Sequence, residues 1–212
     1  MTSVLPDAVV TLVTGDLPTA FVAEAITEGR AVVDTETSGL DWAADHLDLI
    51  QVGIPSARKV VLVRPADHPA LLIRLLEDSA VEKIFHHACF DLRFLCSRWP
   101  VRPRHITCTK VTSKILRPNA GDEAHSLRSL VEMYCGVSLD KTLQRSDWSS
   151  LDLSQDQLSY AAQDVLFLAE LRDRLMAEAT SAEAIDLVQA SCDYIPSRVL
   201  LDLSGAGDVF TH

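Results

Sequence analysis

The 212-residue chain has few aromatic residues and no long apolar run, and both absences limit what it can be. Aromatic residues make up 6% of the sequence. No hydrophobic stretch approaches the roughly 20 residues of a membrane-spanning helix. Residues 1–16, MTSVLPDAVVTLVTGD, contain no basic residue and carry acids early, unlike a secretory signal. We therefore expect a cytoplasmic protein with no membrane partner.

Cysteines are also few, and they show no paired spacing. The five are widely separated and never form a CxxC motif, at positions Cys89, Cys96, Cys108, Cys135 and Cys192. This pattern argues against a disulfide framework or a structural zinc site. We expect reduced thiols, mostly buried, that pack as small hydrophobic side chains.

Charge is unevenly distributed along the chain. The sequence has 30 acidic and 19 basic residues, for a net charge of -11, which disfavours loose adhesion to a long polyanion. Residues 92–121, however, contain no Asp or Glu and hold seven cations: Arg93, Arg98, Arg102, Arg104, Lys110, Lys114 and Arg117. This basic run predicts a small or locally held anionic partner.

The hydrophobic pattern predicts an α/β fold. Strands are expected at residues 8–14, from 31, at 47–54 and at 59–64, with the last three forming an antiparallel meander. Asp16 and Gly29 are expected to cap and end a helix between the first two strands. Helices at 70–77, 90–99 and 109–116 then alternate with short strands at 83–86 and 105–107. We expect one domain over residues 1–212, with a mixed sheet flanked by helices.

From residue 125 onward the pattern is helical. A helix over residues 126–135 ends at Gly136, and Ser154 with Gln157 forms a capping box that opens a helix to about residue 177. A last helix, about 181–192, precedes the tail 193–212. Because the tail is too apolar to be a free linker, we expect it to pack on the domain or on a neighbouring subunit.

Two acids end the second predicted strand, in the segment AVVDTETSGLD. Asp34 and Glu36 point to one face because side chains alternate along a strand. Acids are disfavoured in a strand unless something compensates them. Beside the turn at Ser38 and Gly39, the pair predicts a site for a hard divalent cation. The alternative is a pair of strand-end charges in solvent.

Further acids occur where they could reach this strand. Asp91 follows the strand KIFHH and opens the next helix, although an acid at a helix N-terminus is also favourable in itself. Tyr160 and Asp164 are four residues apart in the predicted long helix, so a phenol and a carboxylate project from one face.

In this order, Asp34, Glu36, Asp91 and Asp164 with Tyr160 resemble the tyrosine branch of the DEDD superfamily of 3′-5′ exonucleases. The resemblance implies a ribonuclease H-like fold and two divalent cations, Mg²⁺ or Mn²⁺, that support phosphodiester hydrolysis. It also implies that Asp34 bridges the cations, that Glu36 and Asp164 complete one site, and that Asp91 acts largely through water. Tyr160 would position the attacking water.

Other segments are similar to narrower groups. Residues 139–148 (LDKTLQRSDW) resemble the ribonuclease D group, while KIFHHACFD, ITCTK and the tail look like NrnC-type enzymes, the compact nano-RNases. That resemblance implies cleavage of very short single-stranded RNA, down to dinucleotides, and a ring-like homo-oligomer. His87 and Cys108 stand where many DEDD or ribonuclease D proteins have Asn and Asp, and both are NrnC-like.

Substrate contacts are expected from Thr37, Leu40, His87, Phe90, Lys110, Gln144 and Trp148. Leu40 is the apolar candidate for packing against a base, whereas Trp148 is equally compatible with a core position. His86 is expected to pack or to contact substrate. Two other functions stay open: a ribonuclease D-type or proofreading-type exonuclease acting on longer RNA or DNA, and a non-catalytic RNA-binding scaffold. The scaffold predicts a broken acid quartet, and this quartet is complete.

Overall fold

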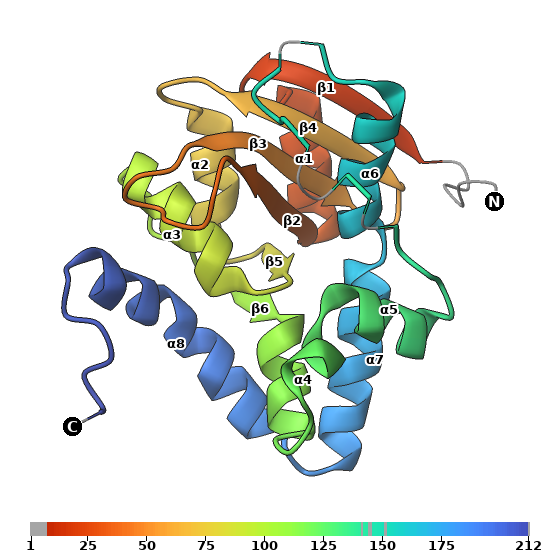
Figure 1. The fold of residues 1–212 in the computed structure, drawn as a ribbon, viewed down its shortest axis with the longest axis vertical. Helices are drawn as coiled ribbons and strands as arrows, with labels where there is room; N and C mark the ends of the chain where they lie inside the picture. Colours follow the sequence, from red (N-terminus) through yellow and green to blue (C-terminus); the bar gives the residue numbers. More distant parts are fainter. Residues whose placement is uncertain (1–7, 141, 144–145, 151, 212) are drawn as a thin grey trace.

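The computed structural model describes residues 8–140, 142–143, 146–150 and 152–211, and Gln144 lies outside them. The described part contains a six-stranded sheet in the order β1-β4-β3-β2-β5-β6 (Figure 1). Its strands are β1 (Val9–Gly15), β2 (Arg30–Thr37), β3 (Leu47–Ile54), β4 (Lys59–Pro65), β5 (Glu82–Phe85) and β6 (Ile106–Cys108). The predicted mixed sheet flanked by helices is confirmed.

Strand directions bring the carboxyl ends of every strand of this sheet except β3 to one edge. β2, β3 and β4 form the predicted antiparallel meander, and β1 pairs with β4 in parallel. β5 runs parallel to β2, and β6 runs parallel to β5. The carboxyl ends of β2, β5 and β6 therefore share an edge, where the acids of β2 lie.

Helices cover both faces of the sheet (Figure 1). Before residue 140 they are α1 (Thr19–Glu28), α2 (Ala70–Glu77), α3 (Ala88–Arg98), α4 (Thr109–Leu116), the short 3₁₀ helix η1 (Asp122–His125) and α5 (Leu127–Cys135). Val33 of β2 faces the core shared with α1 and α2, while Val32 faces the core under α6 (Gln155–Leu166). Side chains alternate, so Asp34 and Glu36 share the α6 face with Val32.

The prediction of one long helix from Ser154 to about residue 177 is wrong, because the segment forms two helices. α6 ends at Leu166, and α7 (Leu168–Ser181) begins after Phe167. The predicted capping box is present: Ser154 Oγ accepts from Gln157 N at 3.2 Å, and Gln157 Oε1 accepts from Ser154 N at 2.9 Å. The break lets α6 lie on the sheet while α7 packs against α4 and α5.

The last helix is longer than predicted. α8 spans Ile185–Leu203 and includes Pro196, so most of the expected tail is helical. Its buried residues Val188, Cys192, Ile195 and Val199 recur every three or four positions and face α3, α4 and β6. Near the end of α8, Asp202 Oδ2 pairs with Arg93 Nη2 of α3 at 2.6 Å. No described helix is long and apolar enough to cross a membrane.

Asp16 caps a different helix from the one predicted. α1 begins after Pro18 without a side-chain cap, although Gly29 ends it in the left-handed conformation at φ 72°, as expected. Asp16 accepts instead from Leu71 N at 2.7 Å and Leu72 N at 3.0 Å. Its carboxylate therefore satisfies the first turn of α2.

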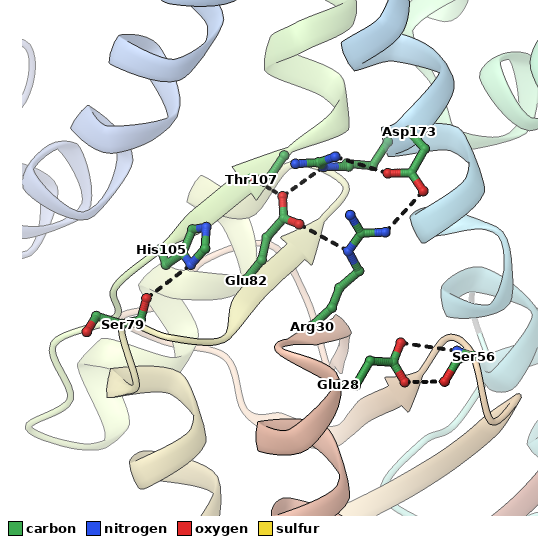
Figure 2. A network of polar contacts seen from close by, with 9 residues as sticks. Glu28, Arg30, Ser56, Ser79, Glu82, His105, Thr107 and Asp173 are labelled. Atoms are coloured by element: carbon green, nitrogen blue, oxygen red, sulfur yellow. Dashed lines mark hydrogen bonds and ion pairs between the residues drawn. The ribbon is translucent and has the colours of Figure 1, made fainter.

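A buried ionic network ties β2, β5 and β6 to α7 at the opposite end of β2 from Glu36 (Figure 2). Glu82 is 4% exposed. It accepts from Arg172 Nε at 2.8 Å and from Thr107 Oγ1 at 2.6 Å, and it pairs with Arg30 Nε at 3.2 Å. Asp173 extends the network, pairing with Arg30 Nη1 at 3.0 Å. Glu82 is thus a buried acid whose partners all come from the protein.

We expect Glu82→Gln to lower the free energy of unfolding by about 2 kcal/mol, because Arg30 and Arg172 each lose a charge-assisted hydrogen-bond partner and keep only Asp173 among the described residues. Urea denaturation at neutral pH measures the loss. Glu24→Gln is the control, because the pair of Glu24 with Lys59 is about 40% exposed (39% and 43%) and should contribute under about 1 kcal/mol. Equal small losses in both variants would contradict this role for Glu82.

Candidate metal centre

Three carboxylates from β2 and α6 converge under the sheet edge. Asp34 and Glu36 lie on the face of β2 that α6 covers, and Asp164 projects from α6. One oxygen of each lies within 4.8 Å of one from each of the other two. Acids separated by 130 residues in sequence are therefore brought to one point.

Asp91 lies beside this group without belonging to it. It sits in the first turn of α3 and is 1% exposed. Thr35 Oγ1 donates to Asp91 Oδ1 at 2.7 Å, whereas Asp91 Oδ2 is buried and has no hydrogen-bond partner among the described residues. A buried carboxylate oxygen of this kind is costly unless it gains a ligand.

The site is electrostatically strained as a cluster of acids alone. Burial raises the pKa of Asp34 to about 7. Burial, with the charges of Asp34, Asp164 and Asp91, raises the pKa of Glu36 to about 10, against a hydrogen bond from Gln51 that lowers it. Burial and the charge of Asp34 raise the pKa of Asp91 well above its ordinary value. Ionised together, these groups need a compensating positive charge.

The donor set fits divalent cations of the hard class. Its ligand atoms are carboxylate oxygens, which Mg²⁺ and Mn²⁺ prefer over softer nitrogen and sulfur ligands. The unpartnered oxygen of Asp91 adds a further donor next to the three converging carboxylates. Asp34, Glu36 and Asp164 are thus the residues that would hold a cation, with Asp91 adjacent.

Tyr160 lies in α6, four residues before Asp164, and is 7% exposed. Burial raises its pKa, and the charges of Asp164, Glu36 and Asp34 raise it further. The phenol therefore stays protonated at neutral pH and can donate a hydrogen bond. The ring of Trp148 packs against it with a centroid distance of 5.9 Å.

Trp148 is a core residue, so its expected substrate contact is not supported. It is 2% exposed and belongs to the apolar cluster between α6 and the sheet. The core position that the sequence left open is the one observed. Gln144, from the same segment, lies outside the described residues.

Leu40 stands on a tightly closed loop beside Glu36. Its side chain is 84% exposed. Thr37 Oγ1 donates to Gly39 O at 2.6 Å, and Asp45 Oδ2 accepts from Asp41 N at 2.8 Å. A Cβ at Gly39 would lie 2.3 Å from Asp45 Oδ2, so any larger residue there would have to displace the Asp45 carboxylate. The loop holds an apolar side chain in solvent at the edge of the site.

Three other expected substrate contacts lie just after strand ends, His87 and Phe90 after β5 and Lys110 after β6. His87 is exposed, has a left-handed backbone (φ 72°, ψ 44°) and stacks on Phe90 at 6.2 Å. Lys110, which is partly buried, acts electrostatically on His86 and His87. His86 packs as expected, with Nδ1 2.8 Å from Thr109 Oγ1. These residues therefore line the same sheet edge as Asp91.

Fewer cations of the basic run, residues 92–121, are available to bind an anionic partner than the sequence suggests. Three of its seven cations pair with acids: Arg93 with Asp202 at 2.6 Å, Lys114 with Asp122 at 3.0 Å, and Arg117 with Glu178 at 3.2 Å. Two of these acids lie far away in sequence, on α7 and α8. The positive face is therefore smaller than a count of Lys and Arg predicts.

Sequence reasoning missed Gln51 and Thr35, which contact the acids directly. Gln51 Nε2 donates to Glu36 Oε1 at 3.2 Å, and Thr35 donates to Asp91. The available signal for Gln51 was a lone amide in the otherwise apolar end of the strand LDLIQVGI. Thr35 had no comparable signal, because threonine is common in strands.

Comparisons with known proteins agree on one family. A family model described as 3′-5′ exonuclease matches residues 10–180. Ribonuclease D of Jannaschia sp. (strain CCS1) is 32% identical over 173 residues, 79% of this chain and 44% of that protein. DNA polymerase I of Aquifex aeolicus is 34% identical over 139 residues, 66% of this chain and 22% of that protein. The chain thus spans half or less of the length of these curated relatives.

Solved structures match over a larger share of their length. Brucella melitensis NrnC bound to pGG is 30% identical with a TM-score of 0.88, covering 97% of this chain and 100% of that one. A nuclease solved in its apo form is 32% identical with a TM-score of 0.89 and the same coverage. Ribonuclease D of Escherichia coli, at 23% identity and a TM-score of 0.74 over 89% of this chain and 50% of that one, shares the fold.

We expect Asp34→Asn to raise the thermal unfolding midpoint in EDTA, and more at pH 8 than at pH 5. Because the pKa of Asp34 rises from 3.8 to about 7, the folded state keeps a proton that the unfolded chain releases over this range. Rising pH therefore penalises the wild-type fold, and Asn removes that penalty. Histidine titration cancels in the difference between the two proteins.

Added Mn²⁺ should raise the midpoint of the wild type and not that of Asp34→Asn. Asp67→Asn, which removes an exposed acid, is the control and should behave as the wild type in both experiments. A pH-independent difference between Asp34→Asn and the wild type would show that Asp34 carries no burial penalty.

Proposed function

Because the chain belongs to the 3′-5′ exonuclease family, to its ribonuclease D-like members close to NrnC, we propose that it is a metal-dependent exoribonuclease acting on short RNA. It would remove 5′-mononucleotides from the 3′ end of oligonucleotides, down to dinucleotides. The observation that carries the proposal is the partly buried convergence of Asp34, Glu36 and Asp164 next to Tyr160. The resemblance predicted from the sequence is confirmed at the level of the family.

The chemistry divides between bound cations and the chain. Two divalent cations, Mg²⁺ or Mn²⁺, would when bound supply the charge that stabilises a transferring phosphoryl group. Asp34, Glu36 and Asp164 would hold them, and Asp91 stays oriented by the hydroxyl of Thr35. Tyr160, protonated at neutral pH, donates a hydrogen bond that orients the attacking water.

Short substrates are favoured by charge and by the loop at Leu40. With a net charge of -11 and three basic-run cations already paired, extra phosphates of a long strand gain little attraction. Leu40 packs against a terminal base, and Thr37, His87, Phe90 and Lys110 contact the sugar-phosphate at the same edge. NrnC of Brucella melitensis, a structural relative, is described as bound to pGG, which supports a very short ligand.

A second candidate is a ribonuclease D-type or proofreading-type exonuclease acting on longer RNA or DNA. The sequence relatives named ribonuclease D and DNA polymerase I favour it. The two candidates share the carboxylate site and differ in how affinity changes with strand length. A direct competition between lengths therefore separates them.

We also propose that residues 1–212 form one cytoplasmic nuclease domain that assembles into a homo-oligomer. Large apolar side chains stay exposed on α8 and after it: Leu187 at 59%, Leu200 at 54%, Val209 at 53% and Phe210 at 76%. An interface would cover such surface. Ile195 and Val199 of the same helix pack in the domain's own core and do not contribute to this exposed surface.

Tyr160→Phe should slow hydrolysis by about 10²-fold while divalent-cation affinity stays unchanged. The ring keeps its packing on Trp148, so only the hydrogen bond to the attacking water is lost. Steady-state rates and a Mn²⁺ titration measure the two quantities. Tyr134→Phe is the matched control, because that hydroxyl donates to Glu178 and serves the α5–α7 contact. An unaltered rate in Tyr160→Phe would leave Tyr160 a packing residue.

In a mixture of a labelled RNA dinucleotide and a twenty-mer with the same 3′ sequence, we expect the dinucleotide to be consumed first at physiological salt. A parallel DNA pair reports the sugar preference. Leu40→Ala should raise KM for the dinucleotide with little change in kcat, because it removes a base contact made in the ground state. Faster consumption of the twenty-mer would support the ribonuclease D-type alternative instead.

A further inference from the structure

Gln51 is a polar residue in an apolar place. It lies in β3, is 0% exposed and faces α6 beside the aliphatic side chains of Leu49 and Leu62. Burying an amide costs roughly 1–3 kcal/mol unless its polar atoms are bonded. A hydrophobic side chain of similar volume would avoid that cost. The position therefore has a requirement beyond packing.

Only one end of the Gln51 amide is satisfied. Nε2 donates to Glu36 Oε1 at 3.2 Å. Oε1 is buried and has no hydrogen-bond partner among the described residues. Gln51 is also the cross-strand partner of Asp34 in the β2–β3 pair, so its side chain stands on the same face as both acids.

We infer that Gln51 is a positioning residue for the cation site, an inference that rests on the proposed function. Its Nε2 hydrogen bond holds one oxygen of Glu36 toward β3 and leaves the other as a ligand beside Asp34 and Asp164. Without this bond, Glu36 has more rotational freedom. Ordering the Glu36 side chain then costs part of the free energy gained when the cation binds, so the cation binds more weakly.

The geometry of the pair suits this role better than a structural one. A structural amide is bonded at both ends, as buried polar groups generally are. The buried amide Gln51 instead makes its hydrogen bond to a carboxylate of the site. The fold accepts a half-satisfied amide there, which is the pattern expected when a site is arranged at some expense to stability.

The test measures Mn²⁺ binding to the full chain without substrate. The electron paramagnetic resonance signal of free Mn²⁺ reports how much of the cation is bound. Gln51→Met should weaken binding by roughly 10- to 100-fold, the usual effect of losing a partner of a metal ligand. Its unfolding midpoint in EDTA should equal or exceed that of the wild type. Gln51→Leu provides a second apolar variant if Gln51→Met packs poorly.

Leu62→Met is the matched control. Leu62 is the β4 neighbour of Gln51 in register and is equally buried, so the change perturbs the same core without touching Glu36. Its Mn²⁺ affinity should equal the wild-type value. Turnover adds a second readout: Gln51→Met should regain rate at saturating Mn²⁺, with KM for the oligonucleotide unchanged.

Wild-type affinity in Gln51→Met and Gln51→Leu would overturn the inference and leave the proposed function standing. A loss of affinity that Leu62→Met reproduces would assign the effect to packing of β3 and overturn it as well. Absence of Mn²⁺ binding by the wild type would instead overturn the proposed function, and the inference with it. The wild-type measurement therefore separates the two failures.

Discussion

The structure is arranged around acids that converge at the end of β2, beside Asp91, which keeps one buried oxygen without a hydrogen-bond partner among the described residues. Two buried acids, one near each end of β2, differ in how many partners the protein gives them. Glu82, at one end, receives donors from Arg30, Arg172 and Thr107 and forms a closed ionic network. Asp91, at the other end, has one donor, and its second oxygen has no hydrogen-bond partner among the described residues. Buried acids are tolerated in both places, but only the first set is satisfied by the protein alone.

This contrast explains the surrounding architecture. β2 must present two acids on one face, so α6 lies over that face and adds Asp164 and Tyr160. The break at Phe167 lets α6 follow the sheet while α7 turns to the Glu82 network. Trp148 packs against Tyr160 within the apolar cluster between α6 and the sheet. Packing of this kind holds like charges closer together than solvent would allow.

Local patterns predicted the strands, the meander and the acids well, because strand alternation and helix capping depend on neighbouring residues. The failures share a cause in distant contacts. The apolar pattern continues across Phe167, so it gives no sign that α6 and α7 are separate helices. Pro196 lies inside α8 and argues locally against a helix, although the apolar spacing of α8 is regular. Asp16 satisfies a helix more than fifty residues away, and Arg93 is neutralised by Asp202, 109 residues later. No local pattern reports such partners, nor the contact of Gln51 with Glu36.

The left-handed backbone at His87 bears on how this sheet edge can change in evolution. A φ of 72° between β5 and α3 favours the residues that tolerate this conformation best, chiefly Gly, Asn, Asp and His. An exchange of His87 for Asn would keep the turn that aims α3, and with it Asp91. Substitutions at position 87 are therefore limited mainly to side chains that tolerate this backbone, and β-branched residues are disfavoured by the backbone alone.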